Sequence, residues 1–258
     1  MPDYQLLPWD SDFFGFPVAL IVAPELTVDR LEHALRDMAR APVKLAYWPA
    51  DPVARGPSDE DIHRLGGMLV DRKTTFAKEL RRAAGDSIGD TLPDGVERYR
   101  PEMGTSDLIG LAVAAGQHSR FAVDPHIPRR KFEELYSIWL LRSLAKERAD
   151  EVLVVRRRAA CAGFATVSER NGQGDIGLIA VGEAYRGQGI GGALVSAADW
   201  WFRRRGCTRA QVVTQEANAP ACQLFARCGY TIEKVTPYYH FWLGVPDMMG
   251  ERSDMIMS

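Results

Sequence analysis

A glycine-rich turn follows a short apolar run in the second half of the chain. Residues 186–192, RGQGIGG, contain four glycines and one cation soon after the apolar run 176–181. Glycine lacks the Cβ that would keep an anion away from backbone N–H groups. The helix predicted to begin here adds the positive end of its dipole. We therefore expect the turn to bind an oxygen-rich anion such as a pyrophosphate.

Spacing separates the known kinds of phosphate-binding turn. A Walker loop ends in Gly-Lys-Ser/Thr, and no such ending follows here. A dinucleotide-binding fingerprint requires Gly-x-Gly-x-x-Gly, whereas this turn is Gly187-x-Gly189-x-Gly191. Arg186-x-x-Gly189-x-Gly191 resembles instead the acetyl-CoA signature of the GNAT superfamily of N-acetyltransferases, Arg/Gln-x-x-Gly-x-Gly/Ala. The alternative is a flexible glycine loop before a surface helix.

A second motif supports the resemblance. The segment from Asn218 to Tyr230, NAPACQLFARCGY, is similar to the superfamily's Asn-x-x-Ala-x-x-Leu-Tyr-x-x-x-Gly-Phe, with Gly229 predicted to end a helix. Two motifs in the expected order are more specific than either alone. The resemblance implies an α/β (α+β) GNAT fold, a mixed central sheet flanked by helices, with a smaller N-terminal α/β domain.

The resemblance also implies how acetyl-CoA would be held. The strand that ends at Val181 would pair with the pantetheine amides, and Asn218 would hydrogen-bond the cofactor arm. Asn218 at a helix start is equally a candidate N-cap. The predicted cofactor-binding residues are Ile179, Ala180, Val181, Arg186, Gly187, Gln188, Gly189, Ile190, Gly191, Gly192, Asn218 and Phe225.

Phe225 departs from the pattern, because many superfamily members carry a tyrosine there that is thought to protonate the departing sulfur. The acid is therefore absent, relocated or unnecessary, since a thiol of pKa near about 8.5 is already a tolerable leaving group. We predict Tyr239 and His240 as the catalytic replacements; packing on a terminal strand is the alternative. The cofactor strand has a carboxylate only at its start, Asp175, so we expect water to accept the amine's proton.

Four segments narrow the resemblance to the dTDP-fucosamine acetyltransferases, which acetylate a dTDP-linked 4-amino-4,6-dideoxyhexose. They are residues 7–15 (LPWDSDFFG), Ser119-Arg120-Phe121, the helix 131–144 with Tyr136 and Trp139, and Tyr239-His240-x-Trp242. Arg120 and Tyr136 are the predicted acceptor-binding residues, since a guanidinium fork suits a diphosphate. A surface charge and core packing are their respective alternatives. Acetylation of another amine, or an acyl-CoA-binding module that has lost catalysis, are the rival functions.

Hydrophobic periodicity predicts two domains. Residues 1–81 would form the small α/β domain, with strands at 17–22, 43–48 and 68–80 and helices at 27–40 and 59–65. Residues 82–95, rich in Gly, Asp and Ala, are predicted to be a linker. Residues 96–243 would form the acetyltransferase domain and 244–258 a frayed tail. In the acetyltransferase domain we predict strands at 96–100, 152–156, 162–167, 176–181 and 210–214 and helices at 105–115, 129–146, 192–205 and 218–229.

Composition limits the partners. The 258 residues carry a formal net charge of −2, so we expect neither a nucleic-acid partner nor an anionic membrane. No apolar run reaches a membrane-spanning length. The four cysteines lack metal-ligand spacing, so we predict no metal and reduced thiols in a cytoplasmic protein. The expected partner is a small-molecule acceptor, and the sequence leaves a homodimer open.

Overall fold

The computed structural model describes residues 3–23, 25–51, 56–80 and 91–244. The chain divides into two compact units, one made of residues 1–70 and 236–258 and the other of residues 71–235. Two long strands, β4 (Gly67–Glu79) and β10 (Thr231–Trp242), begin in one unit and end in the other. The smaller unit is therefore discontinuous in sequence.

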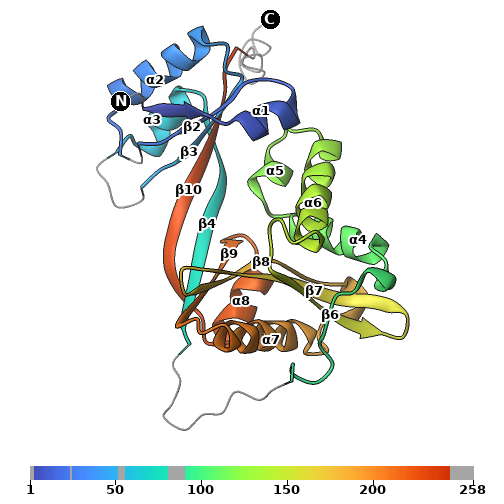
Figure 1. The fold of residues 1–258 in the computed structure, drawn as a ribbon. Coiled ribbons are helices and arrows are strands. Elements are labelled where there is room, and N and C mark those ends of the chain that lie inside the picture. The colour runs from blue at the N-terminus through green and yellow to red at the C-terminus, as the bar shows by residue number, and fades with distance from the viewer. Residues whose placement is uncertain (1–2, 24, 52–55, 81–90, 245–258) are drawn as a thin grey trace, which may run out of the picture. The chain divides into compact units, whose positions relative to one another are not determined.

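The smaller unit packs helices against a short sheet (Figure 1). The end of β10 pairs antiparallel with β3, β3 pairs parallel with β2, and β2 pairs antiparallel with β1. The first turn of α2 is capped by the Thr27 hydroxyl, which accepts from the Arg30 N–H. The elements are β1 (Tyr4–Leu6), α1 (Pro8–Phe14), β2 (Val18–Ile21), α2 (Val28–Arg40), β3 (Leu45–Pro49) and α3 (Asp59–Arg64).

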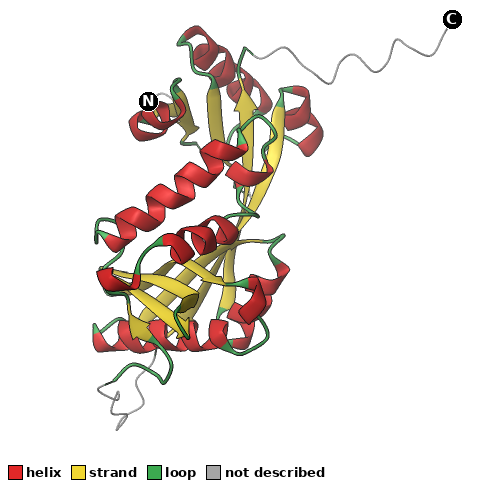
Figure 2. Ribbon diagram, turned by 90° about the vertical axis from the view of Figure 1, so that its right-hand side faces the viewer, coloured by secondary structure: helices red, strands yellow, loops and turns green. Residues whose placement is uncertain are grey.

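The larger unit is a mixed sheet covered by helices, in the strand order β10-β4-β9-β8-β7-β6-β5. The pair β8·β9 is parallel, whereas β4·β9, β5·β6, β6·β7 and β7·β8 are antiparallel. Helices α4 to α6 cover one face of this sheet, and α7 and α8 cover the other (Figures 1 and 2). The strands are β5 (Glu97–Arg98), β6 (Glu151–Arg157), β7 (Ala160–Arg170), β8 (Gln173–Val181) and β9 (Arg209–Gln215); the helices are α4 (Ser106–Ala115), α5 (Arg120–Val123), α6 (Arg129–Leu144), α7 (Ile190–Arg204) and α8 (Ala219–Arg227), with short 3₁₀ turns at Pro101–Met103 and Glu183–Tyr185.

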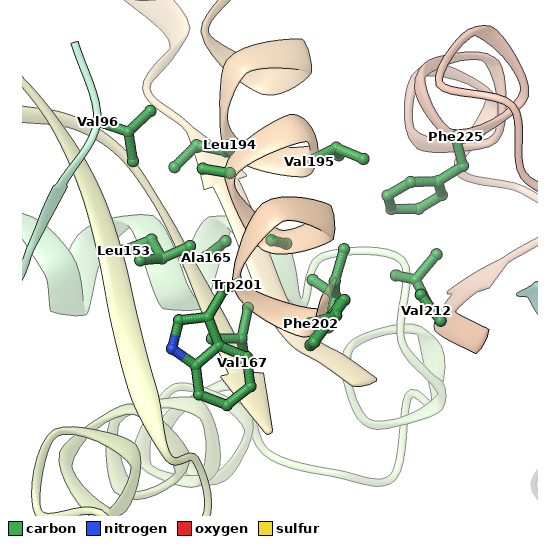
Figure 3. Close-up of a cluster of buried hydrophobic side chains, with 14 of the residues drawn as sticks. Val96, Leu153, Ala165, Val167, Leu194, Val195, Trp201, Phe202, Val212 and Phe225 are labelled. Atoms are coloured by element: carbon green, nitrogen blue, oxygen red, sulfur yellow. The ribbon is translucent and has the colours of Figure 1, made fainter. Parts of the chain in front are cut away.

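The main core of the larger unit lies between the sheet and α7. Buried positions on α7 recur at helical spacing and include Leu194, Ala198 and Phe202. Figure 3 shows Leu194 and Phe202 in the same cluster as strand residues such as Val167 and Val212. This packing fixes the start of α7 relative to the ends of β8 and β9, where the site is built.

The predicted α/β architecture with a mixed, helix-flanked sheet is confirmed, and most predicted elements are present to within a few residues. Helix α7 begins at Ile190, two residues earlier than predicted. Strand β1, helix α1 and the return of β10 into the smaller unit were not predicted. The unit boundaries fall within β4 and β10 and differ from the predicted boundary at 82–95. Residues 81–90 and 245–258, which hold most of that linker and the predicted tail, lie outside the described residues.

No helix within the described part of the chain is long and apolar enough to cross a membrane.

Candidate functional site

Strands β8 and β9 diverge at the centre of the larger unit. They pair in parallel only over Gln173–Ile176 and Arg209–Val212. Beyond these residues β8 continues to Val181 and β9 to Gln215 without further pairing to each other in the described register. The last residues of β8 therefore turn one row of backbone N–H and C=O groups toward the opening between the strands.

A bulge directs the end of β8. The register of β7 against β8 shifts between Ala165 and Val167, where β8 has one extra residue. At the bulge the Leu178 N–H donates to the hydroxyl of Thr166 at 2.8 Å. Because a bulge bends and twists its strand, it contributes to the divergence of β8 from β9.

The glycine-rich turn leads from β8 into α7. Gly187 and Gly189 have φ of +74° and +79°, a region that side chains with a Cβ rarely adopt, and Gly189 is the N-cap of the helix. A Cβ added at Gly187, Gly189 or Gly192 would meet no atom within 4 Å, so the turn leaves open space over the first turn of α7. Gly191 differs, because its Cβ would lie 3.0 Å from Leu224 of α8.

These elements line a pocket of about 660 Å³. The end of β8, the glycine-rich turn and the start of α8 form its walls, and α4 with the residues after it closes another side. Of the predicted cofactor-binding residues, Gln188 is the one outside its lining. The pocket combines unpaired strand groups with an open helix N-terminus, which suits a ligand that has both amides and a diphosphate. Its lining includes Ile179, Ala180, Val181, Arg186, Gly187, Gly189, Ile190, Gly191, Gly192, Asn218 and Phe225.

Asn218 lies at the N-cap of α8, and its Oδ1 accepts from the Ala221 N–H at 3.3 Å. The capping prediction is therefore confirmed, while Asn218 also lines the pocket. Phe225, buried on the same helix, packs 5.7 Å from the Phe76 ring, centroid to centroid. Phe225 lines the pocket. It is the residue that replaces the tyrosine of the family pattern, so the pocket lacks that hydroxyl here.

A second pocket of about 230 Å³ adjoins the first. It lies beside β4, β9, α5 and α6, and its lining includes Arg120 and Tyr136. Five residues line both pockets: Ala115, Ile179, Asn218, Ala221 and Phe225. Molecules bound in the two pockets would therefore meet at the divergence of β8 and β9.

Both predicted acceptor residues line this second pocket, and Tyr136 lies on the helix predicted for it. Arg120 begins the short helix α5, and its guanidinium carbon is 4.5 Å from the centroid of the Phe121 ring. Tyr136 is buried on α6, and a Cβ at Gly116 would collide with its ring at 2.4 Å. Burial raises the pKa of Tyr136, so its hydroxyl stays protonated near neutral pH.

Two charged residues of β4 were missed by the sequence analysis. Asp71 and Lys73 stand two residues apart on the strand, hence on one face, and both line the second pocket. Burial raises the pKa of Asp71 to about 7, although Arg120 and Lys73 oppose this shift. The signal that could have identified Asp71 was the presence of a carboxylate within the predicted strand 68–80. No local pattern indicated that β4 would pair with β9 of the larger unit.

Tyr239 and His240, the predicted catalytic pair, are not among the residues that line either pocket. Both are buried in the smaller unit, opposite Trp48 and Tyr47 of β3. The Tyr239 hydroxyl donates to Asp59 at 2.9 Å, so its proton already has an acceptor. Packing between β10 and β3 accounts for both residues, and we do not retain them as acid catalysts.

Among the described residues no group of acidic, histidine or cysteine side chains is arranged to hold a metal ion.

Comparison with known proteins agrees with this geometry. Residues 118–230 match the family described as Acetyltransferase (GNAT) family. The chain is 28% identical over 166 residues to the spore coat polysaccharide biosynthesis protein SpsD of Bacillus subtilis, which covers 64% of this chain and 57% of that protein. It is 36% identical over 62 residues to a streptothricin acetyltransferase of Escherichia coli, covering 24% of this chain and 36% of that protein. The chain thus spans less than two thirds of the length of either relative.

The fold has solved counterparts. A GCN5-related N-acetyltransferase from Sphaerobacter thermophilus superimposes with a TM-score of 0.56 at 15% identity, covering 93% of this chain and 76% of that chain. The diverging strands and the glycine-rich turn agree with this match, and residues 118–230 of the chain are similar to the acetyltransferase (GNAT) family.

Proposed function

We propose that the chain is an acetyl-CoA-dependent N-acetyltransferase that acts on the amino group of a nucleotide-linked amino-deoxyhexose, of the dTDP-4-amino-4,6-dideoxyhexose type. The observation that carries the proposal is the junction of the two pockets, whose five shared residues bring a donor site and an acceptor site together. A thioester in the larger pocket would then face an amine in the smaller one.

The larger pocket offers groups that match each part of acetyl-CoA. The diphosphate would lie on the first turn of α7, where Gly189, Gly191 and Gly192 line the pocket and the first backbone N–H groups of the helix have no partner within it. The pantetheine arm would extend along the end of β8 and pair with its free backbone groups. With its Oδ1 engaged in the helix cap, Asn218 offers the arm its amide N–H₂ as a donor.

The protein's main contribution to the reaction would be placement. Acetyl-CoA supplies an activated acyl group, and holding it next to the amine is worth roughly 7 to 11 kcal/mol. The buried ring of Phe225 lines both pockets and would keep water away from the reacting atoms. This apolar contact is what Phe225 offers in place of a hydroxyl.

The smaller pocket supports a sugar acceptor. Its volume of about 230 Å³ lies below the roughly 300–1,000 Å³ of typical ligand sites, so it suits the deoxyhexose ring, and the nucleotide would extend beyond it. Arg120 and Lys73 provide positive charge for a diphosphate at its wall. The similarity to SpsD, which is named as a spore coat polysaccharide biosynthesis protein, supports a sugar substrate.

Arg120→Ala tests this placement. We expect the KM for the sugar nucleotide to rise roughly 10- to 100-fold, because a charged contact of about 1.5–3 kcal/mol is lost, while the KM for acetyl-CoA stays nearly unchanged. The matched control is Arg129→Ala, an exposed arginine of α6 that pairs with Glu133. Equal rises in both constants would mean that Arg120 has a structural role.

A second candidate is acetylation of another amine. The similarity to a streptothricin acetyltransferase over 62 residues favours an aminated small molecule as the alternative acceptor. A module that binds acyl-CoA without catalysis rests on Phe225 alone.

Thiol release from acetyl-CoA, measured with a panel of acceptors, separates these functions. The panel contains dTDP-linked 4-amino sugars, the same sugars without the nucleotide, streptothricin, and a peptide with a free N-terminus. We expect fastest release with the nucleotide-linked amino sugar. Preference for streptothricin or the peptide would overturn the assigned acceptor, and binding of acetyl-CoA without release for any amine would indicate the non-catalytic module.

A further inference from the structure

The smaller pocket contains a carboxylate that the placement argument does not use. Asp71 lies on β4, and it is the only carboxylate among the described residues that line either pocket. Its Oδ1 is buried and has no hydrogen-bond partner within the described part of the protein. A buried carboxylate oxygen without a partner is costly, which points to a ligand that completes its contacts.

The other acids near the site are already engaged or lie elsewhere. Asp175, at the start of β8, accepts from the Gln211 side chain at 2.9 Å. Asp199 is buried on α7, where it pairs with Lys78 and Tyr230. Neither lines a pocket. Asp71 is thus the acid positioned to contact a molecule in the acceptor pocket.

An amine acceptor supplies what Asp71 lacks. Aliphatic amines are mostly protonated at neutral pH, and an ammonium has no lone pair with which to attack a thioester. An acceptor must therefore lose a proton in the site. Its ammonium can first donate a hydrogen bond to the carboxylate and then transfer that proton to it.

We propose that Asp71 binds the ammonium of the acceptor and acts as the general base that converts it to the neutral amine. This inference rests on the proposed N-acetyltransferase function. One proton passes from nitrogen to Asp71 and later to solvent. The amine nitrogen forms a bond to the thioester carbonyl carbon, the carbon–sulfur bond breaks, and the departing sulfur takes the second proton from nitrogen, directly or through water. Amide, CoA thiol and one released proton balance the reaction.

The groups around Asp71 suit this role. Arg120 of α5 and Lys73 of β4 favour its ionised form, whereas burial disfavours it, and the result is a pKa of about 7. Tyr136 of α6 also interacts with Asp71 and stays protonated. From β9 the pocket receives Thr214 and Gln215, which do not titrate. A base with a pKa near the working pH is the most effective kind.

The test compares wild type with Asp71→Asn and Asp71→Glu. The matched control is Glu79→Gln, a carboxylate on the same strand that is exposed and outside both pockets. Kinetics use the dTDP-linked amino sugar at pH 7 and, as a weakly basic amine, hydroxylamine. Calorimetry follows binding of the amino sugar in the presence of CoA, in two buffers of different ionisation enthalpy, so that proton release on binding is counted.

We expect Asp71→Asn to lower kcat for the amino sugar by roughly 10²- to 10⁴-fold and to lower that for hydroxylamine by less than about tenfold, because hydroxylamine is largely neutral at pH 7. Asp71→Glu should recover part of the loss. Wild type should release a fraction of a proton when the ammonium binds, since a cation displaces the proton from Asp71, and Asp71→Asn should release none. Circular dichroism checks that each variant is folded.

These measurements distinguish a failure of the role proposed for Asp71 from a failure of the proposed N-acetyltransferase function. If Asp71→Asn turns over the amino sugar within about fivefold of wild type, or releases the same fraction of a proton on binding, the role of Asp71 is overturned while the N-acetyltransferase function stands. If wild type neither binds nor acetylates the amino sugar, the proposed function is overturned, and the inference that rests on it with it.

Discussion

Phe225 lacks the hydroxyl group that a tyrosine would carry at this position, so it cannot act as an acid. Its ring is buried and borders both pockets, yet it offers no proton to the departing sulfur. The sequence suggested Tyr239 and His240 as substitutes, but both are buried in the smaller unit and line neither pocket. A thiolate of pKa near about 8.5 leaves without an acid at moderate cost. The proton transfer that needs help from the protein is therefore the removal of a proton from the acceptor ammonium, which we assign to Asp71.

The ionisation of Asp71 also makes the stability of the protein depend on pH. Burial raises the pKa of Asp71 to about 7 from an ordinary value of 3.8. At a pH between these two pKa values, Asp71 holds a proton in the folded chain but not in the unfolded chain. The free energy of unfolding therefore falls as the pH rises through this range. Asp71→Asn removes that dependence. We expect the Tm of the variant minus that of wild type to be more positive at pH 8 than at pH 5, by about 2–4 °C for each kcal/mol.

Thermal unfolding at both pH values checks this, with Glu79→Gln as the control that should show a small and constant difference. A Tm difference for Asp71→Asn that is the same at pH 5 and pH 8 would mean that Asp71 titrates alike in the folded and unfolded chains.

At the scale of elements, the start of α7 provides a clean test of the donor pocket. Gly192 lines that pocket, and a Cβ there would meet no atom within 4 Å. It is the third residue of α7, where an acidic side chain stabilises a helix but would repel a diphosphate. We expect Gly192→Asp to weaken acetyl-CoA binding at least about tenfold, since two like charges about 4 Å apart near a surface cost several kcal/mol.

Calorimetric titration measures this affinity, and Ser196→Asp, an exposed position later on the same helix and outside the pocket lining, is the control. Gly192 is preferable to Gly189, whose positive φ makes any substitution strained, and to Gly191, which packs against Leu224. Unchanged affinity in a folded Gly192→Asp protein would move the diphosphate away from this turn.

A group of polar contacts connects β4, α7 and the end of α8. Lys78 of β4 donates to Asp199 of α7 at 2.5 Å and to the Cys228 carbonyl, just after α8, at 2.7 Å. Tyr230 donates to the other Asp199 oxygen at 2.7 Å, and burial together with Asp199 raises the pKa of Tyr230. Asp199 is buried, so its loss would leave the Lys78 charge unpaired.

We expect Asp199→Ala to lower the free energy of unfolding by about 3–5 kcal/mol, measured by urea denaturation. Glu233→Ala, which breaks the more exposed pair with Arg209, should cost less than about 1 kcal/mol. Similar losses in the two variants would show that burial adds nothing to the Lys78–Asp199 pair.

The elements also show what the sequence could predict. The glycine-rich turn and the helix after it were predictable, because their signals are local: four glycines, one cation and a preceding apolar run. The bulge at Leu178 was not, since it depends on the Thr166 hydroxyl of a neighbouring strand. Asp71 was missed for the same reason, because Arg120 and Tyr136, whose electrostatic interactions involve its carboxylate, come from helices far along the chain.

At the scale of the whole molecule, the error in the predicted domain boundary has a similar cause. The segment at 82–95 has the composition of a linker, and composition was the only boundary signal available. The actual boundaries lie inside β4 and β10, two strands with regular patterns and no break. Pairing between the first and last thirds of the chain, such as Trp48 opposite Tyr239, cannot be read from a local pattern.

In the proposed reaction, the acetyl group passes directly from one pocket to the other while both substrates are bound. The alternative is a covalent relay through Cys228, a residue of the donor pocket lining. Burial raises the pKa of its thiol, which makes it a poor nucleophile. The most direct measurement is the initial rate of thiol release at several fixed concentrations of acceptor and acetyl-CoA. Intersecting double-reciprocal lines are the predicted result, whereas parallel lines, which indicate an acetylated enzyme intermediate, would contradict the account.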